Sequence, residues 1–302
     1  MSKKIYIFKI QILIILCIII YYFYSIFIIF ENKNIVKKKN NKKVKKYKKI
    51  KTKLFQYKLF MKELPIYNHT HYKSNKIFWC WLQGTEKSPK LIRACLNSVK
   101  RNCKNHEIII IRNENINKFV HIPPYILKKF QKNYIGFAHF ADLLRLELLL
   151  KYGGTWIDST VLITKYNHIF FKNDLFFFQQ HKYPWYAGSN WFISAEKESP
   201  ILRTTLDMLY EFWARNNKIW HYFLFHLFLK MACKKYMKDY KNIPLYSNRP
   251  PHLLKRILFK PFNILKYNHI LKYTTVHKLT RKRTTNKIKG LVYHHILDKF
   301  LF

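Results

Sequence analysis

The sequence predicts an α/β fold with a mostly parallel central sheet, followed by helices at the C-terminus. Short apolar runs alternate with segments of helical periodicity from residue 75 onward, and this alternation is typical of strands joined by helices that cover the faces of a parallel sheet. The segment 75–302 is long enough for one domain with a substantial core. We therefore expect a single main domain, preceded by segments of a different character.

The strands and helices of this domain are expected in alternating order. The expected strands are short apolar runs, and the expected helices carry apolar residues three or four positions apart. We expect strands at 77–82, 107–112, 155–163, 174–180 and 190–195, and helices at 88–102, 124–132, 137–152, 199–216 and 219–238. The last of these helices is apolar on almost every side, which indicates that it is either deeply buried or in contact with a membrane.

The helix expected at residues 137–152 carries a polar stripe on an otherwise apolar surface. Leucines occupy most of its circumference, and no proline or glycine interrupts it after Gly136. His139, Asp142 and Arg145 are three residues apart, so their side chains project from one side of the helix. These side chains are therefore placed to meet a common partner, although a surface ion pair between Asp142 and Arg145 would show the same spacing.

A glycine turn joins this helix to a short strand that ends on an isolated carboxylate. Gly153 and Gly154 end the helix in backbone conformations that glycine adopts at little cost. The short segment Thr155–Ile157 then places Asp158 at the carboxyl end of a strand, where open α/β sheets bind their ligands. Asp158 is thus a candidate site residue, and the alternative is that it caps the following turn.

The first 74 residues divide into a short tail at 1–9, a transmembrane anchor at 10–30 and a Lys/Asn-rich tether at 31–74. The anchor contains no lysine, arginine, aspartate or glutamate, and about 20 apolar residues suffice to span a bilayer. A cleaved signal peptide is the alternative. We set it aside because the apolar run is too long and no small-residue cleavage site precedes the lysines.

The lysines around the anchor predict its orientation. Many more lysines follow the anchor than precede it, so the positive-inside rule places the main domain in the cytoplasm of a single-pass membrane protein. The opposite topology, with the domain in the Golgi lumen, stays open for a eukaryotic chain. The lysine-rich tether is also expected to be attracted to anionic lipid at the membrane surface.

The composition argues against a nucleic-acid partner despite a net charge of +42 and a pI near 10.0. Lysine far exceeds arginine, whereas base readout and bidentate phosphate contacts favour arginine. Lys, Asn, Ile, Tyr and Phe are all abundant, as an AT-rich coding sequence would produce. The five cysteines are odd in number and show neither a disulfide framework nor the spacing of a zinc site.

Several segments share the motif pattern of one protein family. The longest pattern is Ala-His-Phe-x-Asp-x-x-Arg followed by Tyr-Gly-Gly-x-Trp-x-Asp-x-Thr, at residues 138–160. Other matching segments are IFWCWLQG at Ile77–Gly84, SPKLIRACLNSVK at 88–100, HEIIIIRN at His106–Asn113, SNWFISAEKESPIL at Ser189–Leu202, YFLFHLFL at Tyr222–Leu229, PPHLLK at Pro250–Lys255 and VHKLTRK at Val276–Lys282. With these residues the chain resembles the capsular polysaccharide synthesis family, glycosyltransferases with an Asp-x-Asp-type sugar-binding region, similar to glycosyltransferase family 32.

The resemblance implies a single GT-A-type, Rossmann-like domain that binds a nucleotide-sugar. It implies a membrane-anchored hexosyltransferase that moves a sugar from a nucleoside diphosphate donor, with UDP favoured, to a glycan or lipid-linked acceptor. The product would be a cell-surface glycan such as capsular polysaccharide or lipopolysaccharide, formed with retention of configuration. The alternatives are a catalytically degenerate relative and a basic scaffolding protein of the membrane surface.

The resemblance also implies the catalytic residues and a metal. Asp158 and Thr160 would hold a divalent cation, Mn²⁺ or Mg²⁺, since hard cations prefer oxygen ligands that bridge them to a diphosphate. Thr160 stands where the widest form of the motif has a second aspartate, and it brings no charge. Asp142 and Arg145 would bind the hydroxyls of the donor sugar.

The remaining donor-binding residues are also carried over from the family pattern. Trp79 and Trp81 share a face of their strand, and the resemblance implies that Trp81 stacks on the base of the donor; the alternative is that both are core or rim tryptophans. The other residues expected to bind the donor are His139, Trp156, Thr160, Asn190 and His277, the last toward the diphosphate. Lys278 and Arg281 are expected to assist from the C-terminal segment.

Overall fold

The structure is a computed structural model that describes residues 48–180, 186–281 and 290–301. The chain divides into two units, Met1–Leu59 and Phe60–Phe302. Residues 48–59 of the first unit are helical. The predicted tail and anchor, and the tether as far as residue 47, lie outside the described residues. Among the residues that are described, no helix is both long enough and apolar enough to cross a bilayer.

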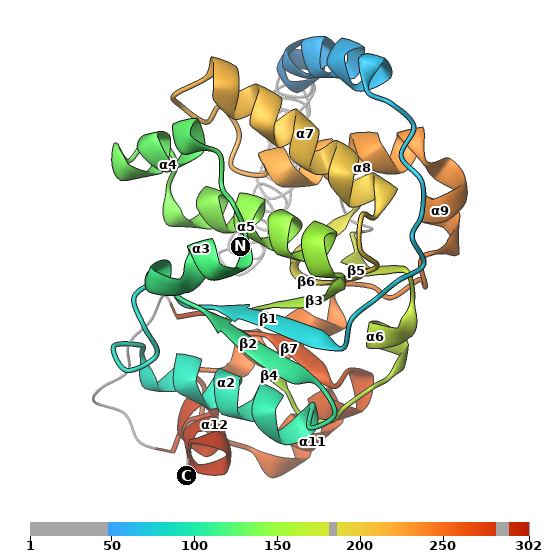
Figure 1. The fold of residues 1–302 in the computed structure, drawn as a ribbon. Coiled ribbons are helices and arrows are strands. Elements are labelled where there is room, and N and C mark those ends of the chain that lie inside the picture. The colour runs from blue at the N-terminus through green and yellow to red at the C-terminus, as the bar shows by residue number, and fades with distance from the viewer. Residues whose placement is uncertain (1–47, 181–185, 282–289, 302) are drawn as a thin grey trace, which may run out of the picture. The chain divides into compact units, whose positions relative to one another are not determined.

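A five-stranded sheet forms the centre of the second unit (Figure 1). Its strands lie in the order β2-β1-β3-β6-β5. They are β1 (Lys76–Cys80), β2 (Glu107–Ile111), β3 (Gly154–Asp158), β5 (Leu175–Gln179) and β6 (Gly188–Ala195). The strand β1 is parallel to β2 and β3, whereas β6 is antiparallel to both β3 and β5.

The predicted α/β class is confirmed, but the sheet is mixed. Four of its strands run in one direction and β6 runs in the other. The reversal follows from the connection between β5 and β6, which contains only residues 180–187. Antiparallel neighbours can be joined by a short connection, whereas parallel neighbours need a crossover of about a dozen residues or more.

A two-stranded sheet lies beside the central one and changes one predicted element. The single strand expected at 155–163 is wrong: a turn at Ser159–Thr160 separates β3 from β4 (Val161–Ile163). The strand β4 pairs antiparallel with β7 (Val276–Lys278), which comes from the C-terminal part of the chain. The turn is fixed from the same side, because the backbone N–H of Leu279 donates to the carbonyl of Thr160 at 2.8 Å.

Helices cover both faces of the central sheet (Figure 1). The helices α5, α7 and α8 lie on one face, where α8 contacts β6 and α5 contacts β1, β3 and β6. On the other side α2 packs against α12 and β4. The helices are α2 (Lys90–Asn102), α3 (Ile116–Phe119), α4 (Pro124–Gln131), α5 (Phe137–Tyr152), α6 (Ile169–Lys172), α7 (Pro200–Arg215), α8 (Leu224–Lys235), α9 (Met237–Asn242), α10 (Leu253–Ile257), α11 (Ile264–Tyr273) and α12 (Val292–Phe300), with short 3₁₀ turns at Asn113–Asn115 and Pro250–His252.

One predicted helix agrees closely with its sequence pattern, and another agrees in burial but not in its bounds. The helix α5 begins and ends at the predicted residues, and its leucines are buried between the sheet and α7. The single helix predicted at 219–238 is wrong in its bounds: α8 begins only at Leu224, and a turn at Tyr236 separates it from α9. The apolar residues of α8 are buried against α7 and β6, so the deeply buried alternative holds for the described residues.

Candidate functional site

A cavity of about 630 Å³ opens at the carboxyl ends of β1 and β3. The nine predicted site residues lie in distant parts of the sequence, yet eight of them line this one cavity. They are Trp81, His139, Asp142, Arg145, Trp156, Asp158, Thr160 and Asn190. The position agrees with the expectation that an α/β sheet binds its ligand at the carboxyl end of its strands.

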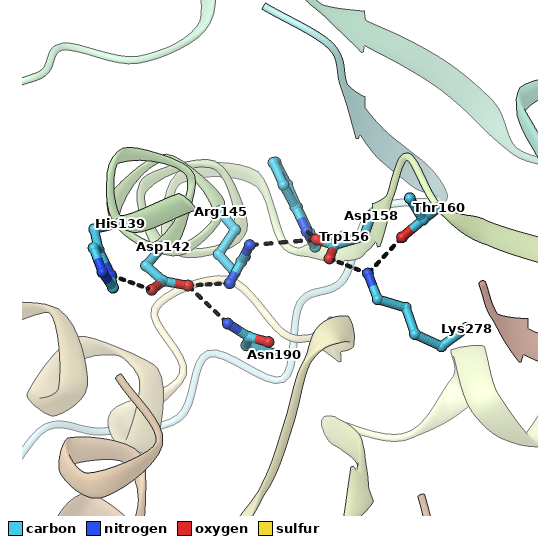
Figure 2. A network of polar contacts seen from close by, with 8 residues as sticks. All are labelled: His139, Asp142, Arg145, Trp156, Asp158, Thr160, Asn190 and Lys278. Atoms are coloured by element: carbon cyan, nitrogen blue, oxygen red, sulfur yellow. Dashed lines mark hydrogen bonds and ion pairs between the residues drawn. The ribbon is translucent and has the colours of Figure 1, made fainter. Parts of the chain in front are cut away.

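The helix side of the cavity is formed by His139, Asp142 and Arg145 of α5 together with Asn190 of β6 (Figure 2). Asp142 Oδ1 accepts hydrogen bonds from Arg145 Nη1 and from Asn190 Nδ2, the latter at 2.8 Å. Asp142 Oδ2 lies 3.5 Å from His139 Nδ1. The three-residue spacing on α5 therefore does place these side chains around one carboxylate.

Arg145 joins the two predicted catalytic carboxylates. It contacts Asp142 within its own helix, and its Nη2 donates to Asp158 Oδ1 at 3.3 Å. The guanidinium lies 5.1 Å from the ring centre of Trp156 and 5.6 Å from that of Phe225. Arg145 is only 3 % exposed, so it is a fixed positive charge behind the cavity rather than a surface partner of Asp142.

The strand side of the cavity is formed by Asp158 and Thr160 with Lys278 of β7 (Figure 2). Asp158 Oδ1 also accepts from Trp156 Nε1 at 2.8 Å. The ammonium of Lys278 donates to Asp158 Oδ2 at 2.6 Å and contacts Thr160 Oγ1 at 2.7 Å. Burial opposes ionisation of Asp158, but Lys278 and Arg145 outweigh it and hold the pKa of this carboxyl below its usual value.

The two tryptophans of the first strand have different surroundings. Trp79 is fully buried and packs against α2 with Ile92 and Leu96. Trp81 packs against the same cluster but also lines the cavity, where the guanidinium of Arg281 lies 5.4 Å from its ring centre. The expectation that both side chains share a face is therefore correct, and Trp81 is the one that reaches the cavity.

His277 is the one predicted site residue that does not line the cavity. It is fully buried in β7, opposite Leu162 of β4, and its Nε2 lies 3.3 Å from Thr164 Oγ1. Burial lowers the pKa of His277 to about 3. Its neighbour Lys278 points to the cavity instead, because successive side chains of a strand face opposite sides.

Two histidines that were not predicted as site residues also line the cavity. They are His226 of α8 and His252, and the Nδ1 atom of each is buried without a hydrogen-bond partner among the described residues. Burial lowers the pKa of His226 to about 4, and burial together with the cations of Lys255 and Lys278 lowers that of His252 to about 4. For His226 the sequence signal is a lone histidine within the apolar run at 223–229.

Asp158 and Thr160 do not form a suitable site for the expected Mn²⁺ or Mg²⁺ as these residues lie. The protein usually supplies one or two carboxylates to such a cation, and water and substrate phosphates supply the other oxygen ligands, so the metal would depend on a free oxygen of Asp158. Both oxygens of Asp158 already accept hydrogen bonds, and Thr160 offers an uncharged hydroxyl that contacts Lys278. A metal ion at this place would be repelled by the positive charges of Lys278 and Arg145. We therefore assign no step of the mechanism to a metal.

A separate group of metal-type side chains lies outside the cavity lining. Ligand atoms of His69, His71 and Glu196 lie within 4.8 Å of one another. His69 contacts Glu196 through Nδ1 and Asp239 through Nε2, the latter at 3.1 Å, and His71 Nδ1 lies 3.4 Å from Asp174 Oδ2. Burial alone would lower the pKa of His69, but its hydrogen bonds to Glu196 and Asp239 raise it. These ion pairs account for the group without a metal.

The Gly153-Gly154 turn fixes the distance between the two sides of the cavity. Both glycines have positive φ, 65° and 104°, a region that other residues adopt only with strain. A Cβ atom on Gly154 would lie 2.5 Å from the carbonyl oxygen of Lys76 on β1. The turn therefore requires glycine both for its backbone conformation and for the close approach of β3 to β1.

The sequence and structure were compared with those of known proteins. Residues 25–299 match the family model described as capsular polysaccharide synthesis protein. The chain therefore belongs to the capsular polysaccharide synthesis protein family, as its motifs predicted. A comparison with curated proteins found no match.

Two solved structures show a weak similarity to this fold. One is titled PaToxG glycosyltransferase, with 16% sequence identity and a TM-score of 0.36, over 67% of this chain and 84% of that one. The other is a transferase with two cysteine-to-serine substitutions, with 14% identity and a TM-score of 0.33, over 59% of this chain and 89% of that one. The family assignment rests on the family model alone.

Proposed function

We propose that the protein is a glycosyltransferase that moves a sugar from a nucleoside diphosphate donor, with UDP favoured, to a cell-surface glycan or a lipid-linked acceptor. One observation carries this proposal. The residues that match the family motif form one polar cavity, in which two carboxylates and an arginine are joined into a single network (Figure 2). Such a cavity offers both acceptors and donors in fixed positions for sugar hydroxyls and phosphate oxygens.

We propose that the three parts of the donor bind against different walls of the cavity. Trp81 lines the cavity, and its aromatic ring offers a surface on which a nucleobase can stack. Among the described residues, four cations line the cavity against two carboxylates, and this excess of positive charge favours a diphosphate. Asp142 and Asn190 on the helix side then face the sugar, for which a carboxylate and an amide provide hydrogen-bond partners.

The reaction exchanges one bond at the anomeric carbon for another. The bond from this carbon to the diphosphate oxygen breaks, and its electron pair stays with the diphosphate. The acceptor hydroxyl oxygen forms the new bond, and its proton passes to the departing diphosphate. We propose front-face attack with retention of configuration, which requires no protein general base, and the protein lowers the barrier by placing fixed positive charge beside the departing diphosphate.

We also propose that residues 10–30 anchor the protein in a membrane, with the catalytic unit on the cytoplasmic side. This part rests on the apolar stretch and on the lysine-rich segment that follows it. Protease treatment of sealed spheroplasts, with an epitope at the C-terminus, tests it. The epitope should survive in intact spheroplasts and disappear after lysis, whereas loss before lysis would reverse the proposed topology.

Donor turnover is the test of the proposed function. The purified full-length protein should be screened for binding and hydrolysis of UDP-, GDP- and CMP-sugars, with and without Mn²⁺. We expect saturable turnover of one donor, abolished in Asp158→Ala and unchanged in Asp298→Ala, since Asp298 is exposed on α12. A folded protein that binds no nucleotide-sugar under any condition would overturn the proposal and favour a scaffolding role.

A degenerate relative is the second candidate function, because the strand side of the cavity has one carboxylate and that carboxylate is paired with Lys278. This alternative predicts that a donor binds in the cavity without being turned over. Binding and hydrolysis measured on the same sample distinguish the two candidates.

A further inference from the structure

The ammonium of Lys278 lies where the motif predicts a metal ion. It is within hydrogen-bond distance of both predicted ligand atoms, Asp158 Oδ2 at 2.6 Å and Thr160 Oγ1 at 2.7 Å (Figure 2). A positive charge that contacts both oxygens occupies the position from which a divalent cation would reach them. The lysine and the predicted metal therefore compete for one place.

The backbone holds Lys278 at this place. Its strand β7 pairs antiparallel with β4, where Lys278 is opposite Val161. The next residue, Leu279, donates its backbone N–H to the carbonyl of Thr160 at 2.8 Å. The pairing with Val161 and the hydrogen bond of Leu279 fix the backbone of Lys278 beside the Asp158–Thr160 turn. Its side chain can therefore change position only by changing rotamer.

The surrounding groups do not provide the ligands that a metal would need to displace this lysine. Asp158 Oδ1 accepts from Arg145 and Trp156. Asp142 is the other carboxylate of the cavity, and its oxygens contact Arg145, Asn190 and His139. Both carboxylates are thus engaged with protein donors, and the guanidinium of Arg145 adds a positive charge beside the place that a metal would take.

An ammonium supplies the same charge stabilisation in another form. Lys278 has three N–H donors, and the network uses two of them, which leaves one for a phosphate oxygen. Lys255 and Arg281 line the same cavity from the C-terminal part of the chain, and Arg281 lies over Trp81, the residue assigned to the base. The diphosphate is therefore expected between Trp81 and Lys278, where positive side chains surround it.

We propose that Lys278 takes the role of the divalent cation: it binds the donor diphosphate and neutralises the charge that the diphosphate gains when the sugar leaves, so that the donor binds without a metal. This inference rests on the proposed function. It differs from the metal-dependent activity that the family resemblance implies, and it assigns Asp158 and Thr160 to the positioning of Lys278.

Nucleotide binding by calorimetry tests this inference without relying on turnover. The full-length protein is treated with EDTA, dialysed, and titrated with UDP, GDP and CMP, with and without Mn²⁺ or Mg²⁺. We expect one nucleoside diphosphate, UDP or GDP, to bind the wild type with the same affinity, within twofold, in the presence and absence of metal. Lys278→Met should lower that affinity at least tenfold, while Lys278→Arg should retain most of it.

The controls separate charge from folding. Lys272→Met removes an exposed lysine on α11 outside the cavity and should leave the affinity unchanged. Circular dichroism and thermal melting establish whether Lys278→Met is folded. If Mn²⁺ restores the nucleotide affinity of this variant but does not change that of the wild type, the result would support the inference that the lysine and a metal occupy the same position.

Three outcomes would overturn the inference. Nucleotide binding to the wild type that is lost with EDTA and restored by Mn²⁺ would show that a metal is required, while leaving the proposed function intact. Unchanged affinity in folded Lys278→Met would show that the lysine does not bind the diphosphate. Absence of binding by every nucleotide, with or without metal, would reject the proposed function as well.

Discussion

The helix side and the strand side of the cavity each pair an aspartate with a cation, but they obtain the cation differently. On the helix side Asp142 pairs with Arg145, three residues later on the same helix. On the strand side Asp158 pairs with Lys278, which is 120 residues later in the sequence. The first pair needs only a helix, whereas the second needs two sheets to form and to pack together.

The two sides also differ in exposure. The side chains of Asp142 and Arg145 are 8% and 4% exposed, whereas those of Asp158 and Lys278 are 24% and 18% exposed. A more exposed cation can exchange a protein partner for a ligand at a smaller cost, because less of its surroundings must be rearranged. Under the proposed function we therefore expect the helix side to act as a rigid support and the strand side to receive the charge of the ligand.

Removal of Arg145 should have the largest effect, because this residue belongs to both sides. Arg145→Met leaves Asp142 and Asp158 without their shared cation, and loss of one partner from a buried ion pair costs about 3–5 kcal/mol. Urea unfolding at pH 7 measures this loss. Arg215→Met is the matched control, since Arg215 forms an exposed ion pair with Glu211, and it should cost about 1 kcal/mol or less. Equal losses in both variants would contradict a supporting role for the helix side.

Neutralisation of the strand-side carboxylate should reduce activity more than it reduces stability. Asp158→Asn keeps the size of the side chain but removes the charge that holds Lys278. We expect donor turnover to fall by about a hundredfold or more, the effect seen when one preorganised group for charge stabilisation is lost. Asp298→Asn should be indistinguishable from the wild type. Normal turnover in Asp158→Asn together with a loss in Asp142→Asn would reverse the roles of the two sides.

A side chain in the glycine turn that joins the two sides should lower the stability of the protein. Gly154→Ala forces a residue with a Cβ into φ 104° and against the carbonyl of Lys76. Backbone strain of this kind costs about 1–3 kcal/mol, which thermal and urea unfolding would detect. Gly136→Ala at the start of α5 is the control, because a Cβ there meets nothing within 4 Å. A Gly154→Ala protein as stable as Gly136→Ala would show that the turn can relax without disturbing the cavity.

The smallest expected effect is a dependence of stability on pH. The folded-state pKa of Asp158 is depressed by Lys278 and Arg145, although burial opposes the shift. A carboxyl of this kind contributes stability above its unfolded-state pKa of about 3.9, and this contribution is lost as the pH falls through the folded-state pKa. The difference in unfolding free energy between wild type and Asp158→Asn should therefore be largest near neutral pH and shrink on acidification. A constant difference from pH 7 to pH 3 would contradict the ion pair.

The sequence by itself determined the local parts of the site. Helix α5 has the predicted bounds, because its leucine periodicity and the flanking glycines act within a few residues of one another. The same local rules place His139, Asp142 and Arg145 on one side of that helix and Asp158 at the end of β3. The motif then connects these residues to a family, and the family match over residues 25–299 confirms that connection.

Only the tertiary structure decided which distant residues complete the site. The motif predicted that His277 contacts the diphosphate and that Lys278 and Arg281 assist, yet His277 is buried and it is Lys278 that faces the cavity. The physical reason is that successive side chains on a strand point to opposite faces of the sheet. A shift of one residue in the strand therefore changes which side chains face the cavity and which are buried on the other face. The pairing of β7 with β4 fixes which set faces the cavity, and that pairing joins residues more than 100 positions apart.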